Sequence, residues 1–94
     1  ALHVIDVNSG SCREASPAAL ATRVNREAVA EIARQLRLRN LSGMVIIDLI
    51  HLKDKTKQVE FAEQLQRAAD SDRGKVTVYG FTALQLLEVI RKAH

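Results

Sequence analysis

Residues 31–50 read EIARQLRLRNLSGMVIIDLI and are the most informative part of the sequence for the fold. This stretch predicts the end of an amphipathic helix, a turn at 40–43 and a strand that begins at Met44. Asp48 is the single acid in the strand. The bulky and β-branched residues around it predict a strand buried on both faces, where a carboxylate is costly unless its charge is compensated. We therefore expect Asp48 to have a partner elsewhere in the chain.

The beginning of the chain offers that partner. Leu2–Val7 is expected to form a second apolar strand. Asp6 and Asn8 are two residues apart where this strand ends, so they can share a face, or nearly so. A crossover helix can bring this strand beside that of Asp48, which would unite two carboxylates and an amide oxygen, the ligands that Mg²⁺ prefers. The same spacing also suits aspartates that cap a helix or bond to a turn, so the spacing alone leaves both interpretations open.

The first helix is expected from Pro17 to about Arg39, because Ser16 is a suitable N-cap and proline suits the first helical position. The arginines on its polar face form either a salt-bridged surface exposed to solvent or an RNA contact. The residues expected on the buried face are Ala28, Val29, Ile32 and Leu36, and the arginines opposite them are Arg23, Arg26, Arg34 and Arg37.

A second helix is expected to reach about Asp70, with Asp54 or Thr56 as its N-cap. A third strand follows over Lys75–Tyr79, with Val76 and Val78 on one face. The buried stripe of the helix is expected to consist of Phe61, Ala62, Leu65, Ala68 and Ala69.

Thr82 and Gln85 have the spacing of a capping box, and Phe81 with Leu86 has that of a hydrophobic staple. They predict a third helix to about Lys92, with Leu84, Leu87 and Ile90 buried. The order β-α-β-α-β-α then indicates a small α/β domain, in which helices pack on a three-stranded sheet of parallel or mixed strands.

The totals fit one domain over residues 1–94, with 14 Lys and Arg against 11 Asp and Glu. This mild positive charge is compatible with a nucleic-acid partner. Cys12 is the single cysteine, which excludes an internal disulfide and a cysteine-rich zinc site. No apolar run is long enough to span a membrane. The chain opens directly on a strand without a start Met, so we expect it to be a piece of a longer protein.

Several sequence motifs, taken together, resemble those of the bacterial ribonuclease E/G family across essentially all 94 residues. The most specific is the IARQLRLR–x–L–x–G block with the strand that ends in Ile-Asp. The resemblance is to the DNase I-like subdomain of the catalytic region. Within the family, the GFTAL motif at 80–84 is more similar to ribonuclease G than to ribonuclease E. The other motifs are IDVNSG at 5–10, Asn25-x-Glu27-Ala28, Asp72-Arg73, Leu87-Glu88 and Arg91-Lys92.

The resemblance implies a cytoplasmic, Mg²⁺-dependent endoribonuclease for single-stranded RNA, in which Mn²⁺ can replace Mg²⁺. Such enzymes act in RNA processing and decay, prefer a 5′-monophosphate and form homo-oligomers. In this sequence the resemblance assigns metal binding to Asp6 and Asp48. It assigns orientation of the cluster and of the scissile phosphate to Asn8. Lys75 takes the position of a basic residue that contacts the 5′-monophosphate.

Two departures from the family weaken the enzyme interpretation. His51 occupies the position where the family has a second acid, and the loop Ser11–Ala15 does not match the sequence pattern that the family usually has there. The S1, 5′-sensor and RNase H-like subdomains and the zinc-link lie outside this sequence, so we expect the isolated chain to cut RNA poorly. The alternative hypothesis is a non-catalytic module that binds RNA or protein.

Overall fold

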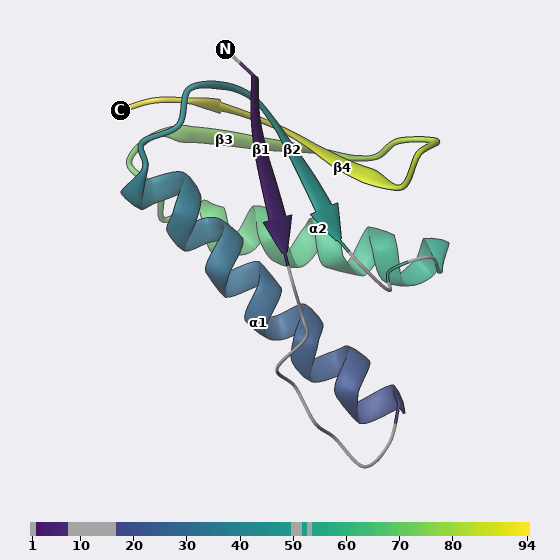
Figure 1. Cartoon of the computed structure of the whole chain (residues 1–94). Coiled ribbons are helices and arrows are strands. Elements are labelled where there is room, and N and C mark those ends of the chain that lie inside the picture. The colour runs from purple at the N-terminus through teal and green to yellow at the C-terminus, as the bar shows by residue number, and fades with distance from the viewer. Residues whose placement is uncertain (1, 8–16, 50–51, 53) are drawn as a thin grey trace.

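The computed structural model describes residues 2–7, 17–49, 52 and 54–94. Its four strands form one sheet in the order β1-β2-β4-β3, and both helices pack against the same face of that sheet (Figure 1). The elements are β1 (Leu2–Val7), α1 (Pro17–Leu38), β2 (Gly43–Leu49), α2 (Lys55–Ala69), β3 (Lys75–Phe81) and β4 (Leu86–Lys92).

The sheet contains both parallel and antiparallel pairs. β1 and β2 run parallel, joined through α1, which confirms that the helix places the first two strands side by side. β4 lies antiparallel to β2 on one side and to β3 on the other. The predicted α/β class is therefore confirmed, and the sheet is the mixed one of the two kinds that the sequence left open, but the predicted number of three strands is wrong.

The core lies on one side of the sheet, between the strands and the two helices. Val45 and Ile47 of β2 are fully buried there, whereas Met44 is 41% exposed and Asp48 is exposed on the other face. The prediction of a strand buried on both faces is thus wrong, because no described helix covers the second face. This uncovered side is called the open face below.

Both helices bury the faces that the spacing predicts. Ile32 and Leu36 of α1 are fully buried, and Phe61, Leu65 and Ala69 of α2 form the second half of the core. Ala28 and Val29 are also buried, and Ala62 and Ala68 are partly buried against this core. None of the described helices has the length and apolar character needed to cross a membrane.

The helix ends follow local capping chemistry. The carboxylate of Asp54 accepts hydrogen bonds from the backbone N–H groups of Thr56 (2.8 Å) and Lys57 (3.3 Å), which confirms Asp54 as the N-cap of α2. α1 begins at Pro17 and ends at Leu38, one residue before the predicted end. The expected N-cap of α1, Ser16, lies outside the described residues.

The predicted third helix is wrong: this segment forms a hairpin that ends in β4. The hydroxyl oxygen of Thr82 accepts hydrogen bonds from the N–H groups of Leu84 (3.2 Å) and Leu86 (3.3 Å), as in a turn. Gln85 has a φ of 65°, which cannot continue a right-handed helix. The threonine that resembled a helix cap therefore closes the turn between β3 and β4.

The strand buries a different set of residues from the predicted helix. Leu87 and Val89 point into the core, whereas Leu84 is 81% exposed and Ile90 faces the open side. Phe81 does not act as a helix staple; its ring packs edge-on against Phe61, with centroids 6.4 Å apart. Pairing with β4 satisfies the backbone groups along one side of both β2 and β3.

Candidate functional site

Asp6 and Asp48 lie directly opposite each other on β1 and β2. Residues in register on neighbouring strands point to the same side, and these two are exposed on the open face. Both stand near the carboxyl ends of their strands, the edge at which open α/β sheets usually bind ligands. The structure therefore brings together two of the three residues that the sequence predicts for the metal site.

The pair has the electrostatics of a cation site. Neither side chain forms a hydrogen bond or ion pair with another described residue. Two like charges on adjacent strands repel each other, so a bound cation would relieve that repulsion. Asn8, the third predicted member, lies outside the described residues.

Two carboxylates match the protein ligands of Mg²⁺, which keeps several of its waters and uses one or two carboxylates. Among the described residues, no group of three or more His, Cys, Asp or Glu side chains is arranged to hold a metal ion. Two oxygen donors of this kind fit Mg²⁺, a hard cation that binds oxygen ligands.

Glu88 is a third acid on the open face. It lies opposite Ile46 in the β2–β4 register, next to the Asp48–Leu86 pair, and is half-buried. The sequence analysis did not predict this position of Glu88, because it assigned the segment to a helix and therefore did not apply the alternation of a strand.

Lys75 is exposed at the start of β3, far from the two aspartates. It lies opposite Lys92 at one end of β4, whereas Leu86, at the other end, lies opposite Asp48. Six residue steps along β4 separate those ends, which is about 20 Å at the rise of a strand. The predicted phosphate contact and the predicted metal ligands thus share the open face but occupy opposite ends.

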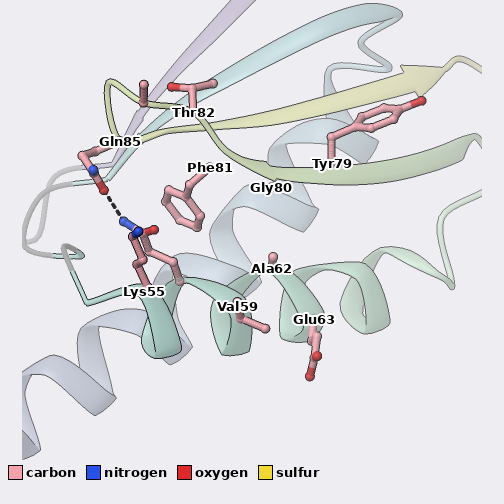
Figure 2. A pocket seen from close by; sticks show the side chains of 11 residues that line it. Lys55, Val59, Ala62, Glu63, Tyr79, Gly80, Phe81, Thr82 and Gln85 are labelled. Carbon is pink, nitrogen blue, oxygen red and sulfur yellow. Dashed lines mark hydrogen bonds between the residues drawn. The ribbon is translucent and has the colours of Figure 1, made fainter.

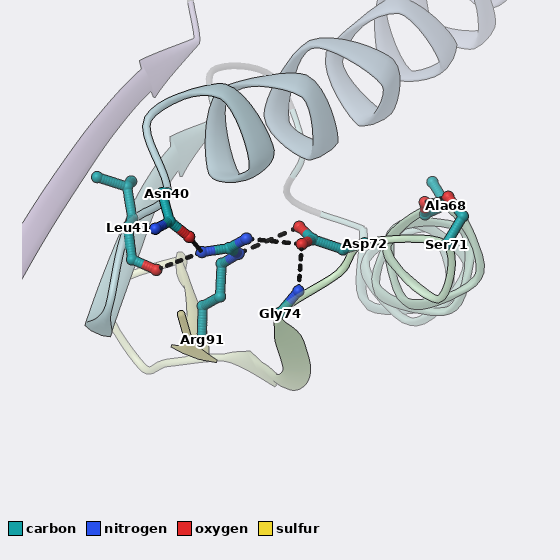
Figure 3. A network of polar contacts seen from close by, with 7 residues as sticks. All are labelled: Asn40, Leu41, Ala68, Ser71, Asp72, Gly74 and Arg91. Atoms are coloured by element: carbon teal, nitrogen blue, oxygen red, sulfur yellow. Dashed lines mark hydrogen bonds and ion pairs between the residues drawn. The ribbon is translucent and has the colours of Figure 1, made fainter. Parts of the chain in front are cut away.

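Arg91 is the centre of a buried polar network that joins three parts of the chain (Figure 3). Its Nη2 and Nε donate to the two carboxylate oxygens of Asp72 at 2.6 and 3.1 Å, and both side chains are only 2% exposed. Its Nη1 donates to Asn40 Oδ1 (2.8 Å) and to the carbonyl oxygen of Leu41 (2.9 Å). The network ties the end of β4 to the turns that follow α1 and α2.

This ion pair changes the chemistry of the acid. The hydrogen bonds from Arg91 lower the pKa of Asp72 despite its burial, and the Gly74 N–H adds a bond of 2.8 Å. A Cβ atom on Gly74 would lie 2.6 Å from the carbonyl oxygen of Lys92, so only glycine fits this close approach. The network therefore fixes the turn that leads into Lys75. The sequence signal for this buried arginine is the spacing of Leu87, Val89 and Arg91, because residues two apart in a strand point to the same face.

A groove of about 700 Å³ lies between α2 and the β3–β4 hairpin (Figure 2). Phe81 points into the space between the hairpin and the helix, and Val59 and Ala62 line the helix side. A hydrogen bond between Gln58 and Gln85 spans one end. The groove does not include Asp6 or Asp48, which lie on the opposite side of the sheet.

The polar face of α1 shows the pairing expected from the sequence. Glu31 accepts hydrogen bonds from Gln35 (2.8 Å) and Arg34 (3.1 Å), which lower the pKa of its carboxyl group. Arg26 and Arg37 are exposed on the same helix. These contacts agree with a salt-bridged solvent face, and an RNA contact by the arginines stays a prediction.

Comparison with known proteins matches residues 1–94 to the Ribonuclease E/G family. The chain is 41% identical over 93 residues to Ribonuclease E of Nostoc sp., which covers 98% of this chain and 14% of that protein. It is 39% identical over 95 residues to Ribonuclease G of Escherichia coli, covering 98% of this chain and 19% of that protein. A Ribonuclease E/G-like protein of Porphyra purpurea is 33% identical. The chain spans less than a fifth of these relatives.

Proposed function

Because the chain belongs to the ribonuclease E/G family, we propose that it is the catalytic part of an Mg²⁺-dependent endoribonuclease for single-stranded RNA. The observation that carries this proposal is the register of β1 and β2, which sets Asp6 opposite Asp48 on the open face. The parent protein would act in RNA processing and decay in the cytoplasm, as a homo-oligomer whose other subdomains help to hold the RNA.

In this proposal Asp6 and Asp48 hold Mg²⁺, or Mn²⁺ in its place, and Asn8 helps to orient the cluster and the scissile phosphate. When bound, the ion lowers the pKa of a water molecule and stabilises negative charge on a phosphate. The two strands hold Asp6 and Asp48 at a fixed separation, because the hydrogen bonds between parallel strands fix the distance between the two backbones. Both carboxylates are exposed, and no described helix covers this side (Figure 1), so within the described part of the chain the open face is accessible to an RNA strand.

At the other end of the open face, Lys75 contacts the 5′-monophosphate of the RNA in this proposal. Lysine presents a compact charge with three donors, which serves phosphate without the bidentate geometry of arginine. The exposed position of Lys75 at the start of β3 supports the assignment.

The second candidate function is a non-catalytic module that binds RNA or protein. His51, in place of the family's second acid, favours it, because the loss of a carboxylate would weaken binding of a cation nearby.

Asp48→Asn in the parent protein separates the two candidates. The change removes one charge from the pair with little change in size, so we expect RNA cleavage to fall at least about 100-fold while the protein stays folded. Cleavage of a 5′-monophosphorylated RNA measures the effect, and circular dichroism checks the fold. Asp70→Asn, which alters an exposed acid at the end of α2, is the matched control. A wild-type cleavage rate in Asp48→Asn would overturn the metal assignment.

A further inference from the structure

Tyr79 presents an exposed aromatic ring on the open face. The residue is 66% exposed, and it borders the α2 groove, yet its ring points away from α2 (Figure 2). Val78 packs against the core, so the next side chain along β3 points to the other side of the sheet. The register of β3 with β4 shifts between Val78 and Gly80, which makes Tyr79 the extra residue of a β-bulge. Such bulges often re-aim a side chain next to a functional site.

Glu88 places a free carboxylate beside this ring. It lies opposite Gly80 in the register of β3 and β4, on the open face. It is half-buried, and it forms no hydrogen bond or ion pair with another described residue. A Cβ atom built on Gly80 would meet no atom within 4 Å, so the space next to the carboxylate is empty. An aromatic ring and a hydrogen-bond acceptor therefore border one open space.

The position of Glu88 points to a ligand other than a metal ion or a phosphate. Glu88 lies diagonally across from Asp48, but no three acids among the described residues are arranged to hold a metal ion. A carboxylate repels the phosphates of an RNA strand. The amino groups of the bases are hydrogen-bond donors, which a carboxylate accepts. The part of an RNA strand that suits Glu88 is therefore a base.

We propose that Tyr79 and Glu88 form a subsite for one base of an RNA strand: the ring of Tyr79 stacks on the base, and Glu88 accepts a hydrogen bond from its amino group. The inference rests on the proposed function, which supplies RNA as the ligand. Single-stranded RNA is commonly recognised by stacking on aromatic side chains and by hydrogen bonds to the base edges. Cytosine offers an amino donor where uracil has a carbonyl oxygen. The subsite therefore selects bases that carry an amino group against uracil.

The subsite lies close enough to the aspartate pair to read the sequence near the cleaved bond. Tyr79 and Asp48 stand on strands separated by β4, and the registers offset them by about two residues along the strands. Strand spacing and rise then put their backbones about 12 Å apart. A few nucleotides span this distance. Tyr79 and Glu88 are thus specificity-determining residues of the proposed reaction, and neither acts on the reacting atoms.

The test is an NMR titration of the 94-residue chain with two RNA probes, without metal. One probe is a uridine hexamer, and the other has one central uridine replaced by cytidine. Both carry a 5′-hydroxyl, so no terminal phosphate contributes. Tyr79 is the single tyrosine of the chain, so its ring signals report stacking directly. We expect both probes to shift these signals and the cytidine probe to bind about three- to tenfold more tightly, the effect of one hydrogen bond.

Two substitutions separate stacking from base selection. Tyr79→Ala should weaken the binding of both probes about fivefold or more, because the stacking surface is lost, whereas Tyr79→Phe should bind like the wild type. Glu88→Gln should bind both probes but lose the preference for cytidine, because an amide both donates and accepts. Circular dichroism checks that each variant is folded.

Glu60→Gln is the matched control for the loss of one negative charge. Glu60 is an exposed acid of α2, which packs on the opposite face of the sheet, so the cytidine preference should not change. The inference would be overturned by wild-type affinity in Tyr79→Ala, or by a cytidine preference that survives in Glu88→Gln. It would also be overturned by a wild-type chain that binds neither probe or does not distinguish them. Ring signals that shift with protein concentration but not with RNA would mean that a second copy of the chain covers this face, which would overturn it as well.

The outcome for this subsite is separable from the outcome for the proposed function. Base-selective binding that depends on Tyr79 and Glu88, in a parent protein that never cleaves RNA, would contradict only the proposed function. Cleavage that is lost in Asp48→Asn, together with RNA binding that depends on neither Tyr79 nor Glu88, would contradict only the inference drawn here.

Discussion

Asp72 and the pair Asp6–Asp48 use the same functional group in opposite ways. The Asp72 carboxylate is buried and both of its oxygens are bound, by Arg91 and by the Gly74 N–H (Figure 3). The carboxylates of Asp6 and Asp48 are exposed, adjacent and without a partner among the described residues. The contrast indicates that Asp72 stabilises the fold, whereas Asp6 and Asp48 are free to bind a ligand.

The largest effect is expected from breaking the buried pair. Asp72→Asn leaves the charge of Arg91 buried without a counter-charge, which typically costs about 3 to 5 kcal/mol of unfolding free energy. Small domains are stable by only about 5 to 15 kcal/mol, so the variant should lose a large fraction of its stability. Urea denaturation followed by circular dichroism measures the change.

Asp70→Asn is the control for this experiment, because Asp70 is exposed two residues before Asp72. A surface change of this kind usually shifts stability by less than about 0.5 kcal/mol. If Asp72→Asn were as stable as Asp70→Asn, the network around Arg91 would not stabilise the fold.

A smaller effect is expected from acid. Bonding to Arg91 lowers the folded-state pKa of Asp72 below its unfolded value, so the carboxylate stabilises the fold fully above the unfolded pKa, about 4. That stability should be lost as the pH falls from about 4 through the lowered folded pKa. Urea midpoints between pH 6 and pH 3 measure the loss.

An apolar replacement of the pair isolates this contribution. In the double variant Asp72→Leu/Arg91→Met, the midpoint should depend less on pH, because the titrating group is absent. Glu31, whose pKa is lowered by bonds from Gln35 and Arg34, is present in both proteins and its contribution cancels. An identical pH dependence in the two proteins would show that Asp72 does not cause the acid sensitivity.

The smallest effect is expected at the open face. Asp48→Asn removes the repulsion between two adjacent carboxylates, so the metal-free chain should keep its stability or gain up to about 1 kcal/mol. Urea denaturation in the presence of a chelator tests this. A loss of more than about 1 kcal/mol would mean that Asp48 stabilises the fold and that its role resembles that of Asp72.

The sequence predicted the first five elements because each carries its own local signal. Pro17 marks the start of α1, Asp54 caps α2, and the apolar run before Asp48 marks β2. The register of β1 and β2 then places Asp6 beside Asp48, as predicted from the crossover. The roles of these residues in metal binding, and that of Lys75 in phosphate binding, stay predictions.

The last strand was not predicted because its local signals conflict. Thr82 and Gln85 have helical capping spacing, yet Thr82 closes a turn and Gln85 adopts a left-handed conformation. Arg91 occupies a core position, so the alternation that marks β4 was hidden by a charge whose partner is 19 residues away. The sequence also did not predict that one face of β2 is open, because Met44 and Ile46 on that face are apolar although neither is fully buried.

A Mn²⁺ titration of the chain, followed by NMR, tests whether Asp6 and Asp48 bind a metal ion. The paramagnetic ion should broaden the amide signals near Asp6 and Asp48 first, and Mg²⁺ should compete for the same site. In the double variant Asp6→Asn/Asp48→Asn this broadening should disappear while the spectrum stays folded. Broadening that is absent from this end of the sheet, or that persists in the double variant, would contradict the claim that the two carboxylates form a metal site.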